Sequence, residues 1–194
     1  MTLANQITFV RILLVPLFAS QVLYYVDTGS EWHRWLALAT FGLAAISDGI
    51  DGFIARRYNQ QTELGAVLDP IADKLLLVCA LVLLSFNQQP FLDRVPLWLV
   101  LTLMGRDLAT GVGFAMLHQS GGNLKVATHW TGKVATALLM GVVVWVLLKW
   151  QSDVMIGLAV MAAVATLASG GFYVRDGYRR LQAAERKKSG TGGT

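Results

Sequence analysis

Four aspartates lie close together in the sequence: Asp48, Asp51, Asp69 and Asp73. The first two are three residues apart and the last two are four apart. On helices, each pair would therefore share one face, within about 60° and 40° respectively. Two neighbouring helices could then present all four carboxylates to one point. Because clustered anions repel each other, this spacing predicts a site that binds cations.

The ligand types in this stretch predict the kind of cation. Carboxylate oxygens without histidine or cysteine favour hard divalent ions, namely magnesium, manganese or calcium, and not zinc. The neighbouring cations, Arg56 and Lys74, cannot balance four carboxylates. Two metal ions would balance them, and two-metal sites serve displacement reactions at phosphorus. We therefore expect two divalent ions, with magnesium as the first candidate and manganese as the second.

The aspartates are set among long apolar stretches. Of the 194 residues, 55% are hydrophobic and only 14% are charged, against roughly 25% charged in a soluble domain. Stretches of about 18 or more apolar residues can cross a membrane core of roughly 30 Å. They occur at 7–26, 34–55, 66–86, 95–117, 131–149 and 154–174. These patterns predict an all-α integral membrane protein with six transmembrane helices, forming one domain over residues 1–184, followed by a flexible cytoplasmic tail at 185–194.

The positive charges predict the orientation of the spans. With a cytoplasmic N-terminus, the outer side would carry only Arg34, Arg94 and Lys149. The inner side would carry Arg11, Arg56, Arg57, Lys125, Lys133, Arg175, Arg179, Arg180, Arg186, Lys187 and Lys188. Cytoplasmic loops are enriched in Lys and Arg, so both termini and the four aspartates are expected at the cytoplasmic side.

The same distribution of charge predicts the surroundings of the protein. The inner cations suit anionic membrane lipids. The sequence contains no nucleic-acid-binding motif, so we expect no nucleic-acid partner. We expect an integral membrane protein with its predicted cation site facing the cytoplasm.

The aspartates also belong to a longer motif: Asp48-x-x-Asp51-Gly52-x-x-Ala55-Arg56, eight residues, then Gly65-x-x-x-Asp69-x-x-x-Asp73. This string resembles the complete signature of the CDP-alcohol phosphatidyltransferases. The opening NQITFVRILLVP is similar to the Asn-x-x-Thr-x-x-Arg opening of members that make anionic phospholipids. The resemblance implies a homodimeric enzyme that transfers the phosphatidyl group of CDP-diacylglycerol to an alcohol and releases CMP.

The resemblance also implies residue roles. The four aspartates would bind two divalent ions, and Asp73 would take the proton of the acceptor hydroxyl. Arg56 would contact the diphosphate, and Gly52 and Ala55 would line the cytidine pocket. The full set expected to bind CDP-diacylglycerol is Asn5, Thr8, Gly52, Ala55, Arg56 and Gly65.

Four further cations predict an acceptor that carries phosphate: Arg11, Arg106, Lys133 and Arg175. Several extra positive charges would help little with serine or choline, but they would bind a phosphorylated alcohol. Each has a structural alternative. Arg106, in the middle of an apolar run, could form a structural ion pair, for example with an aspartate of the cluster. Lys133 could extend to the interface, and Arg11 could be a positive-inside anchor.

Two motifs point to different acceptors. Trp130-Thr131-Gly132-Lys133 with Thr136 is similar to family members that use glycerol 3-phosphate. Arg106-Asp107 instead looks like members that use phosphatidylglycerol and make cardiolipin. We expect glycerol 3-phosphate, with phosphatidylglycerol as the alternative.

A different class, an ion or proton transporter, also places carboxylates in membrane helices. Transporters tend to have inverted repeats and helices broken near the midplane. This sequence shows no such repeat, and its aspartates fall near the ends of spans. The pattern therefore favours the enzyme.

Overall fold

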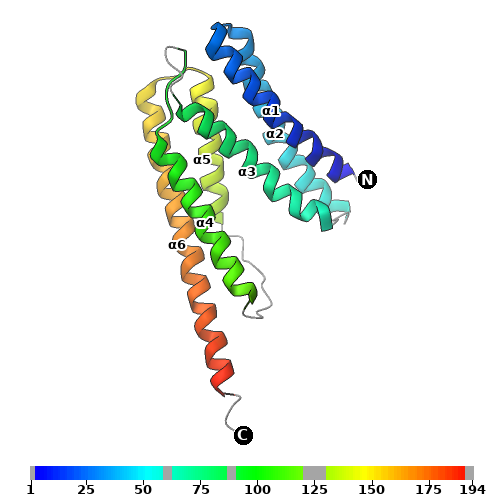
Figure 1. Ribbon diagram of the computed structural model, residues 1–194, viewed down its shortest axis with the longest axis vertical. Coiled ribbons are helices and arrows are strands. Elements are labelled where there is room, and N and C mark those ends of the chain that lie inside the picture. The colour runs from blue at the N-terminus through cyan, green and yellow to red at the C-terminus, as the bar shows by residue number, and fades with distance from the viewer. Residues whose placement is uncertain (1–2, 59–62, 87–90, 120–129, 191–194) are drawn as a thin grey trace. The chain divides into compact units, whose positions relative to one another are not determined.

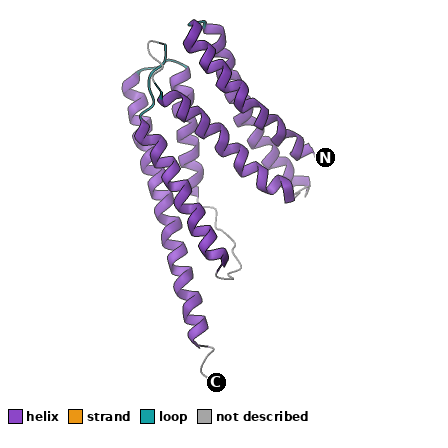
Figure 2. Cartoon of the chain, viewed as in Figure 1, coloured by secondary structure: helices purple, strands orange, loops and turns teal. Residues whose placement is uncertain are grey.

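The structure is a computed structural model that is helical wherever it has regular secondary structure (Figure 2). It describes the backbone at 3–58, 63–86, 91–119 and 130–190, and the side chains at 9–47, 72, 74–86, 91–111, 132–171 and 175. Its helices are α1 (Leu3–Thr28), α2 (Glu31–Tyr58), α3 (Glu63–Ser85), α4 (Leu97–Gln119), α5 (Trp130–Leu147) and α6 (Ser152–Gly190). Each predicted apolar stretch coincides with one helix to within a few residues at its start, which confirms the all-α fold.

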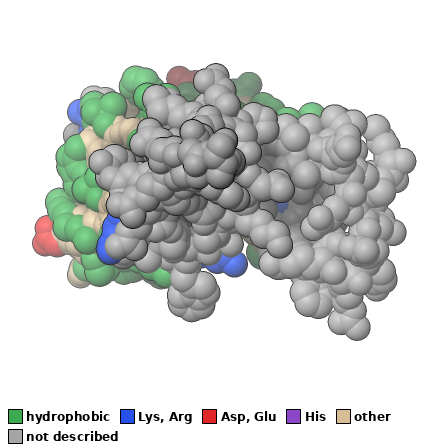
Figure 3. Space-filling view, turned by 90° about the horizontal axis from the view of Figure 1, so that it is seen from below, with side chains coloured by type: hydrophobic (Ala, Val, Ile, Leu, Met, Phe, Trp, Pro, Cys, Tyr) green, Lys and Arg blue, Asp and Glu red, His purple; other side chains and the backbone are tan. Residues whose placement is uncertain are grey.

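The described helices have the surface of a membrane protein. Two windows, Phe9–Thr28 and Ser152–Gly171, are long and apolar enough to span a bilayer, and Lys74–Ser85 and Gly132–Leu147 are shorter apolar helices. Large hydrophobic side chains are exposed, including Leu13 at 69%. Hydrophobic side chains also cover much of the described surface in Figure 3. Such a surface suits lipid contact, while the number of spans and their orientation stay predictions.

The chain divides into two compact units. The first comprises Met1–Leu97 and Met140–Met155, and the second Trp98–Leu139 and Ile156–Thr194. In the first unit α1 and α2 form an antiparallel hairpin, and α1 also packs against α3 (Figure 1). In the second unit α6 continues to Gly190, beyond the predicted boundary at residue 184. The division into a domain and a tail therefore stays a prediction.

The turn between α1 and α2 requires a glycine. Gly29 has a φ of +68°, which a residue with a side chain rarely adopts. Its N–H donates to the Tyr25 carbonyl at 2.8 Å, the bond that commonly closes a helix C-terminus. A Cβ at this position would lie 2.7 Å from Cε1 of Phe91. Gly29 therefore allows the tight turn after which α2 packs alongside α1.

Beside this turn, Glu31 joins three parts of the first unit. Its carboxylate accepts hydrogen bonds from Lys149 Nζ at 2.7 Å, from Arg34 Nε at 2.5 Å and from the Tyr25 hydroxyl at 3.2 Å. Arg34 also donates to the Leu147 carbonyl at 2.7 Å, so it satisfies the last residue of α5. The start of α2 is thus tied to the end of α5.

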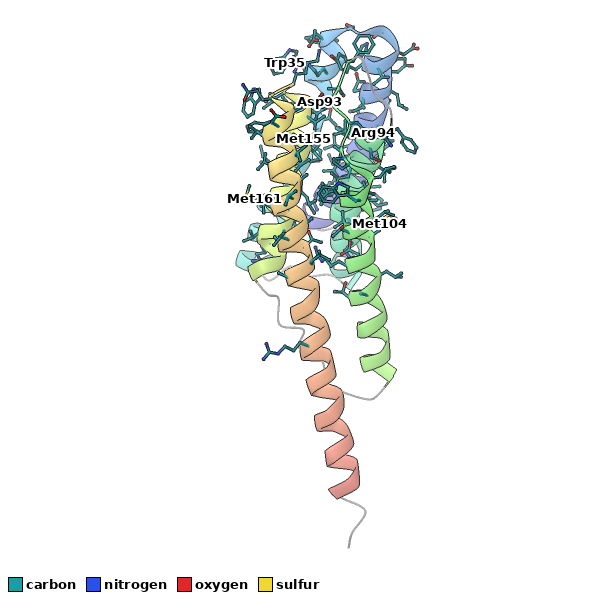
Figure 4. The ribbon with its side chains drawn as sticks, turned by 90° about the vertical axis from the view of Figure 1, so that its left-hand side faces the viewer. Trp35, Asp93, Arg94, Met104, Met155 and Met161 are labelled. Carbon is teal, nitrogen blue, oxygen red and sulfur yellow. The ribbon has the colours of Figure 1, made fainter. Side chains whose placement is uncertain are left out.

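The third outer cation is also engaged within the first unit. Arg94, labelled in Figure 4, donates through Nε to the Ser85 carbonyl at 2.7 Å. Its neighbour Asp93 accepts a hydrogen bond from the Ser152 hydroxyl at 2.7 Å. All three cations expected at the outer side therefore make structural contacts within the first unit.

The Glu31 contacts predict a pH-dependent stability. Hydrogen bonds from Lys149 and Arg34 lower the pKa of Glu31 from 4.5 to about 2. Since the folded-state pKa is depressed, the stabilisation is complete above the unfolded pKa and is lost as pH falls from about 4.5 towards 2. We expect Glu31→Gln to lower the melting temperature at pH 7, and the difference from wild type to shrink below about pH 4.5. Thermal unfolding in detergent across this pH range measures the difference in melting temperature. A difference that stays unchanged down to pH 3 would contradict the lowered pKa of Glu31.

Candidate functional site

The four aspartates lie on two helices of the first unit, Asp48 and Asp51 on α2 and Asp69 and Asp73 on α3. Their side chains fall outside the described residues. The helix bounds still fix their levels along the hairpin. Asp48 precedes the end of α2 by as many residues as Asp73 follows the start of α3, and Asp51 and Asp69 match to within one residue. Antiparallel helices joined by a short link would therefore place Asp48 level with Asp73, and Asp51 level with Asp69. The two levels are about 5 Å apart along the axis.

The buried face of α2 leads to its two aspartates. Arg34, Ala37, Phe41 and Ala44 are all at most 9% exposed, and their alternating spacing of three and four residues marks one helix face. The same spacing reaches Asp48 and then Asp51. These two positions therefore belong to the face that, in its described part, packs inside the first unit.

The buried face of α3 leads to the other pair. Leu77, Leu81 and Leu84 are buried, and stepping back from Leu77 by four residues at a time gives Asp73 and Asp69. On both helices, the row of apolar core residues thus continues into carboxylates at the end near the α2–α3 link. Core positions occupied by acids are costly in a membrane protein unless a ligand or a counter-charge compensates them.

Arg11 lies at the same level on α1. It precedes the end of α1 by as many residues as Asp48 follows the start of α2. Its side chain is 0% exposed, on the face that continues through the buried Phe18, Val22 and Tyr25. A buried guanidinium in an apolar helix needs anionic or polar partners. The buried cation Arg11 of the first unit therefore lies at the level of the aspartates along the helices.

The other three predicted acceptor cations lie in the second unit. The Arg106 side chain on α4 is 15% exposed, and its Nε lies 3.6 Å from Oδ1 of Asp107. Lys133 on α5 and Arg175 on α6 are exposed. The structural alternative for Arg106, an ion pair, is thus present as a long contact with its sequence neighbour. Arg106 also lies against α6, where its Cγ would be 3.4 Å from a Cβ at Gly170.

Several expected residues of the CDP-diacylglycerol site lie where only the backbone is described. Asn5 and Thr8 are on α1, Gly52, Ala55 and Arg56 on α2, and Gly65 on α3. All six thus belong to the three helices of the first unit that carry the aspartates and Arg11. Their roles stay predictions, as does the metal set, because no side chain of theirs is among those described.

The described part of the chain also contains polar residues that the sequence did not single out. Ser169 on α6 is 0% exposed, and its hydroxyl has no hydrogen-bond partner among the described residues. Next to it is Gly170, where an added Cβ would lie 3.4 Å from Cγ of Arg106. In the sequence the only signal was a small polar residue and two glycines inside an apolar run, which is also typical of ordinary helix packing.

Comparison with known proteins shows which family and which proteins the chain is similar to. A family model described as CDP-alcohol phosphatidyltransferase matches residues 1–168. Proteins named CDP-diacylglycerol–glycerol-3-phosphate 3-phosphatidyltransferase from Shigella flexneri serotype 5b (strain 8401) and Escherichia coli (strain K12) are each 34% identical over 166 residues. Each match covers 84% of this chain and 87% of the relative.

Proposed function

The chain belongs to the CDP-alcohol phosphatidyltransferase family, and from that premise we propose that it transfers the phosphatidyl group of CDP-diacylglycerol to glycerol 3-phosphate. The observation that supports this most is the continuation of the buried faces of α2 and α3 into four aspartates, with buried Arg11 at the same level. Such acids have no packing use. Divalent cations would account for the negative charge of the aspartates, and an anionic substrate such as a diphosphate would account for the positive charge of Arg11.

The proposed reaction is a displacement at the phosphorus that carries the diacylglycerol. Asp73 accepts the proton of the acceptor hydroxyl as the new oxygen–phosphorus bond forms. The bond between that phosphorus and the CMP oxygen breaks, and CMP leaves with the electron pair. Arg56 binds the diphosphate, while Gly52 and Ala55 give the cytidine close access to the backbone. Asn5, Thr8 and Gly65 complete the same pocket.

Asp48, Asp51, Asp69 and Asp73 would hold two divalent metal ions. The fit rests on the donor set, since carboxylate oxygens are the ligands that magnesium and manganese prefer, and on the matched levels of the two pairs. When bound, the metals would polarise the phosphoryl oxygens and neutralise the charge that develops on them.

The acceptor assignment has two supports. The relatives that match most of the chain carry glycerol-3-phosphate in their names. Arg11, Arg106, Lys133 and Arg175 supply the positive charge that a phosphorylated alcohol needs. The alternative, phosphatidylglycerol as acceptor with cardiolipin as product, is favoured only by the pair Arg106-Asp107.

We also propose a homodimer in a bacterial inner membrane, in contact with membrane lipids and with the site facing the cytoplasm. The exposed apolar side chains of the described helices support lipid contact. The excess of Lys and Arg around Arg56 and after Arg175 supports the orientation.

Product analysis tests the function. Purified protein in detergent receives CDP-diacylglycerol and magnesium with glycerol 3-phosphate, phosphatidylglycerol or serine. We expect CMP release in equal amount to phosphatidylglycerophosphate with glycerol 3-phosphate, and no lipid product with the other two. Thin-layer chromatography separates the products, and cardiolipin as the only lipid formed would show that the acceptor is phosphatidylglycerol.

A further inference from the structure

Two adjacent residues of α6 lie against the other two helices of the second unit. A Cβ at Gly170 would lie 3.4 Å from Cγ and 3.8 Å from Cβ of Arg106 on α4. A Cβ at Gly132 on α5 would lie 3.4 Å from the Ser169 hydroxyl oxygen. Lys133 directly follows Gly132. The Ser169–Gly170 step therefore adjoins Arg106, one of the expected acceptor-site cations, and Gly132, the residue before Lys133.

The Ser169 hydroxyl behaves unlike the others. In this chain, helical Ser and Thr residues donate to a carbonyl three or four residues earlier at Ser20, Thr28, Thr40, Ser47, Ser85, Thr102, Thr110, Thr136 and Thr166. Thr166, one turn before Ser169, does so to Ala162 at 2.6 Å. Ser169 is 0% exposed, yet its hydroxyl makes no hydrogen bond within the described part of the chain.

A second donor at the same step is also unsatisfied. Nε of Arg106 is buried without a hydrogen-bond partner among the described residues, because Oδ1 of Asp107, at 3.6 Å, is beyond hydrogen-bonding distance. Buried donors that lack a partner destabilise a protein, and alanine would fill the Ser169 position without that cost. Arg106 keeps its ion pair with Asp107, but its Nε and the Ser169 hydroxyl both lack a hydrogen-bond acceptor among the described residues. Such donors suit an anionic ligand with several acceptor oxygens.

We propose that the Ser169–Gly170 step forms part of the acceptor site and recognises a phosphate monoester. The Ser169 hydroxyl donates to the acceptor, and Gly170 is a positioning residue that lets Arg106 lie against α6. This inference rests on the proposed function, in which glycerol 3-phosphate is the acceptor. A phosphate oxygen accepts from both donors, and the hydroxyl adds direction to the charge of the guanidinium.

Ser169→Ala tests the hydroxyl. We expect the KM for glycerol 3-phosphate to rise about tenfold, since a hydrogen bond to a charged group is lost, while the KM for CDP-diacylglycerol stays unchanged. The melting temperature without substrate should stay the same or rise, because an unsatisfied buried hydroxyl is removed. Thr166→Val is the matched control, since that hydroxyl is already satisfied by its own helix. An unchanged acceptor KM in Ser169→Ala would overturn the role of Ser169.

Gly170→Leu tests the positioning role, with Gly171→Leu as the control. Both changes raise helix propensity equally, but no atom of the described residues lies within 4 Å of a Cβ at Gly171. We expect Gly170→Leu to raise the acceptor KM at least tenfold and Gly171→Leu to leave it unchanged. In an Arg106→Ala background, Gly170→Leu should add nothing, because its effect passes through Arg106. Equal effects in the two backgrounds would overturn the positioning role.

The wild-type assay separates this inference from the function on which it rests. Wild-type protein that makes no product from glycerol 3-phosphate would overturn both. Wild-type turnover of glycerol 3-phosphate with Ser169→Ala and Gly170→Leu both at the wild-type acceptor KM would overturn the inference alone.

Discussion

Asp73→Asn is expected to fold and to bind CDP-diacylglycerol but to lose most of its turnover. The amide keeps the shape of the carboxylate and cannot accept the proton of the acceptor hydroxyl. A positioned general base contributes roughly 10² to 10⁴ in rate, so the loss of CMP release should fall in that range. The KM for CDP-diacylglycerol should change much less than kcat, which separates a failed proton transfer from a failed binding site.

Two comparison variants sharpen this test. Asp69→Ala should lower activity too, but through weaker metal binding, so that raising magnesium recovers part of its turnover. Turnover in Asp73→Asn should stay low even at saturating magnesium, because the base is missing. Asp153→Asn is the matched control, because Asp153 is an exposed acid in the first turn of α6 and should keep wild-type turnover. Near wild-type turnover in Asp73→Asn would show that another group accepts the proton.

The six helices were predictable because apolar length is a local property of the sequence. The prediction that each aspartate pair shares one helix face was local as well, since residues three or four apart lie on one face. The structure adds what such spacing lacks, namely that the described parts of α2 and α3 in line with these positions are buried, as Phe41 on α2 and Leu81 on α3 show.

Contacts between distant residues were not predictable in this way. Glu31 and Lys149 are separated by 118 residues, and no sequence pattern around either residue predicts their contact. Ser169 and Gly170 look like ordinary small residues of a membrane helix until Arg106 and Gly132 are seen beside them. The role proposed for these two residues depends on which helices α6 contacts, and the sequence of α6 alone does not predict those contacts.

Removing divalent metal is expected to abolish CMP release completely. The charges of the first unit give the reason. Arg11 is buried at the level of Asp48 and Asp73, but Lys74 is exposed, where water and salt weaken its field. In the proposed site the four carboxylates would therefore have too little positive charge around them, and a bound diphosphate would add more negative charge still.

EDTA followed by dialysis should give protein without activity, and magnesium or manganese should restore it. Stability provides a readout that does not depend on turnover, because a metal that binds only the folded state raises the melting temperature by mass action. Magnesium should therefore raise the melting temperature of wild type and of the control Asp153→Asn, and should have little effect on Asp69→Ala. Full CMP release in metal-free buffer would refute the two-metal site. A magnesium response equally large in Asp69→Ala would mean that the ion binds elsewhere, so the two measurements test the need for metal and its location separately.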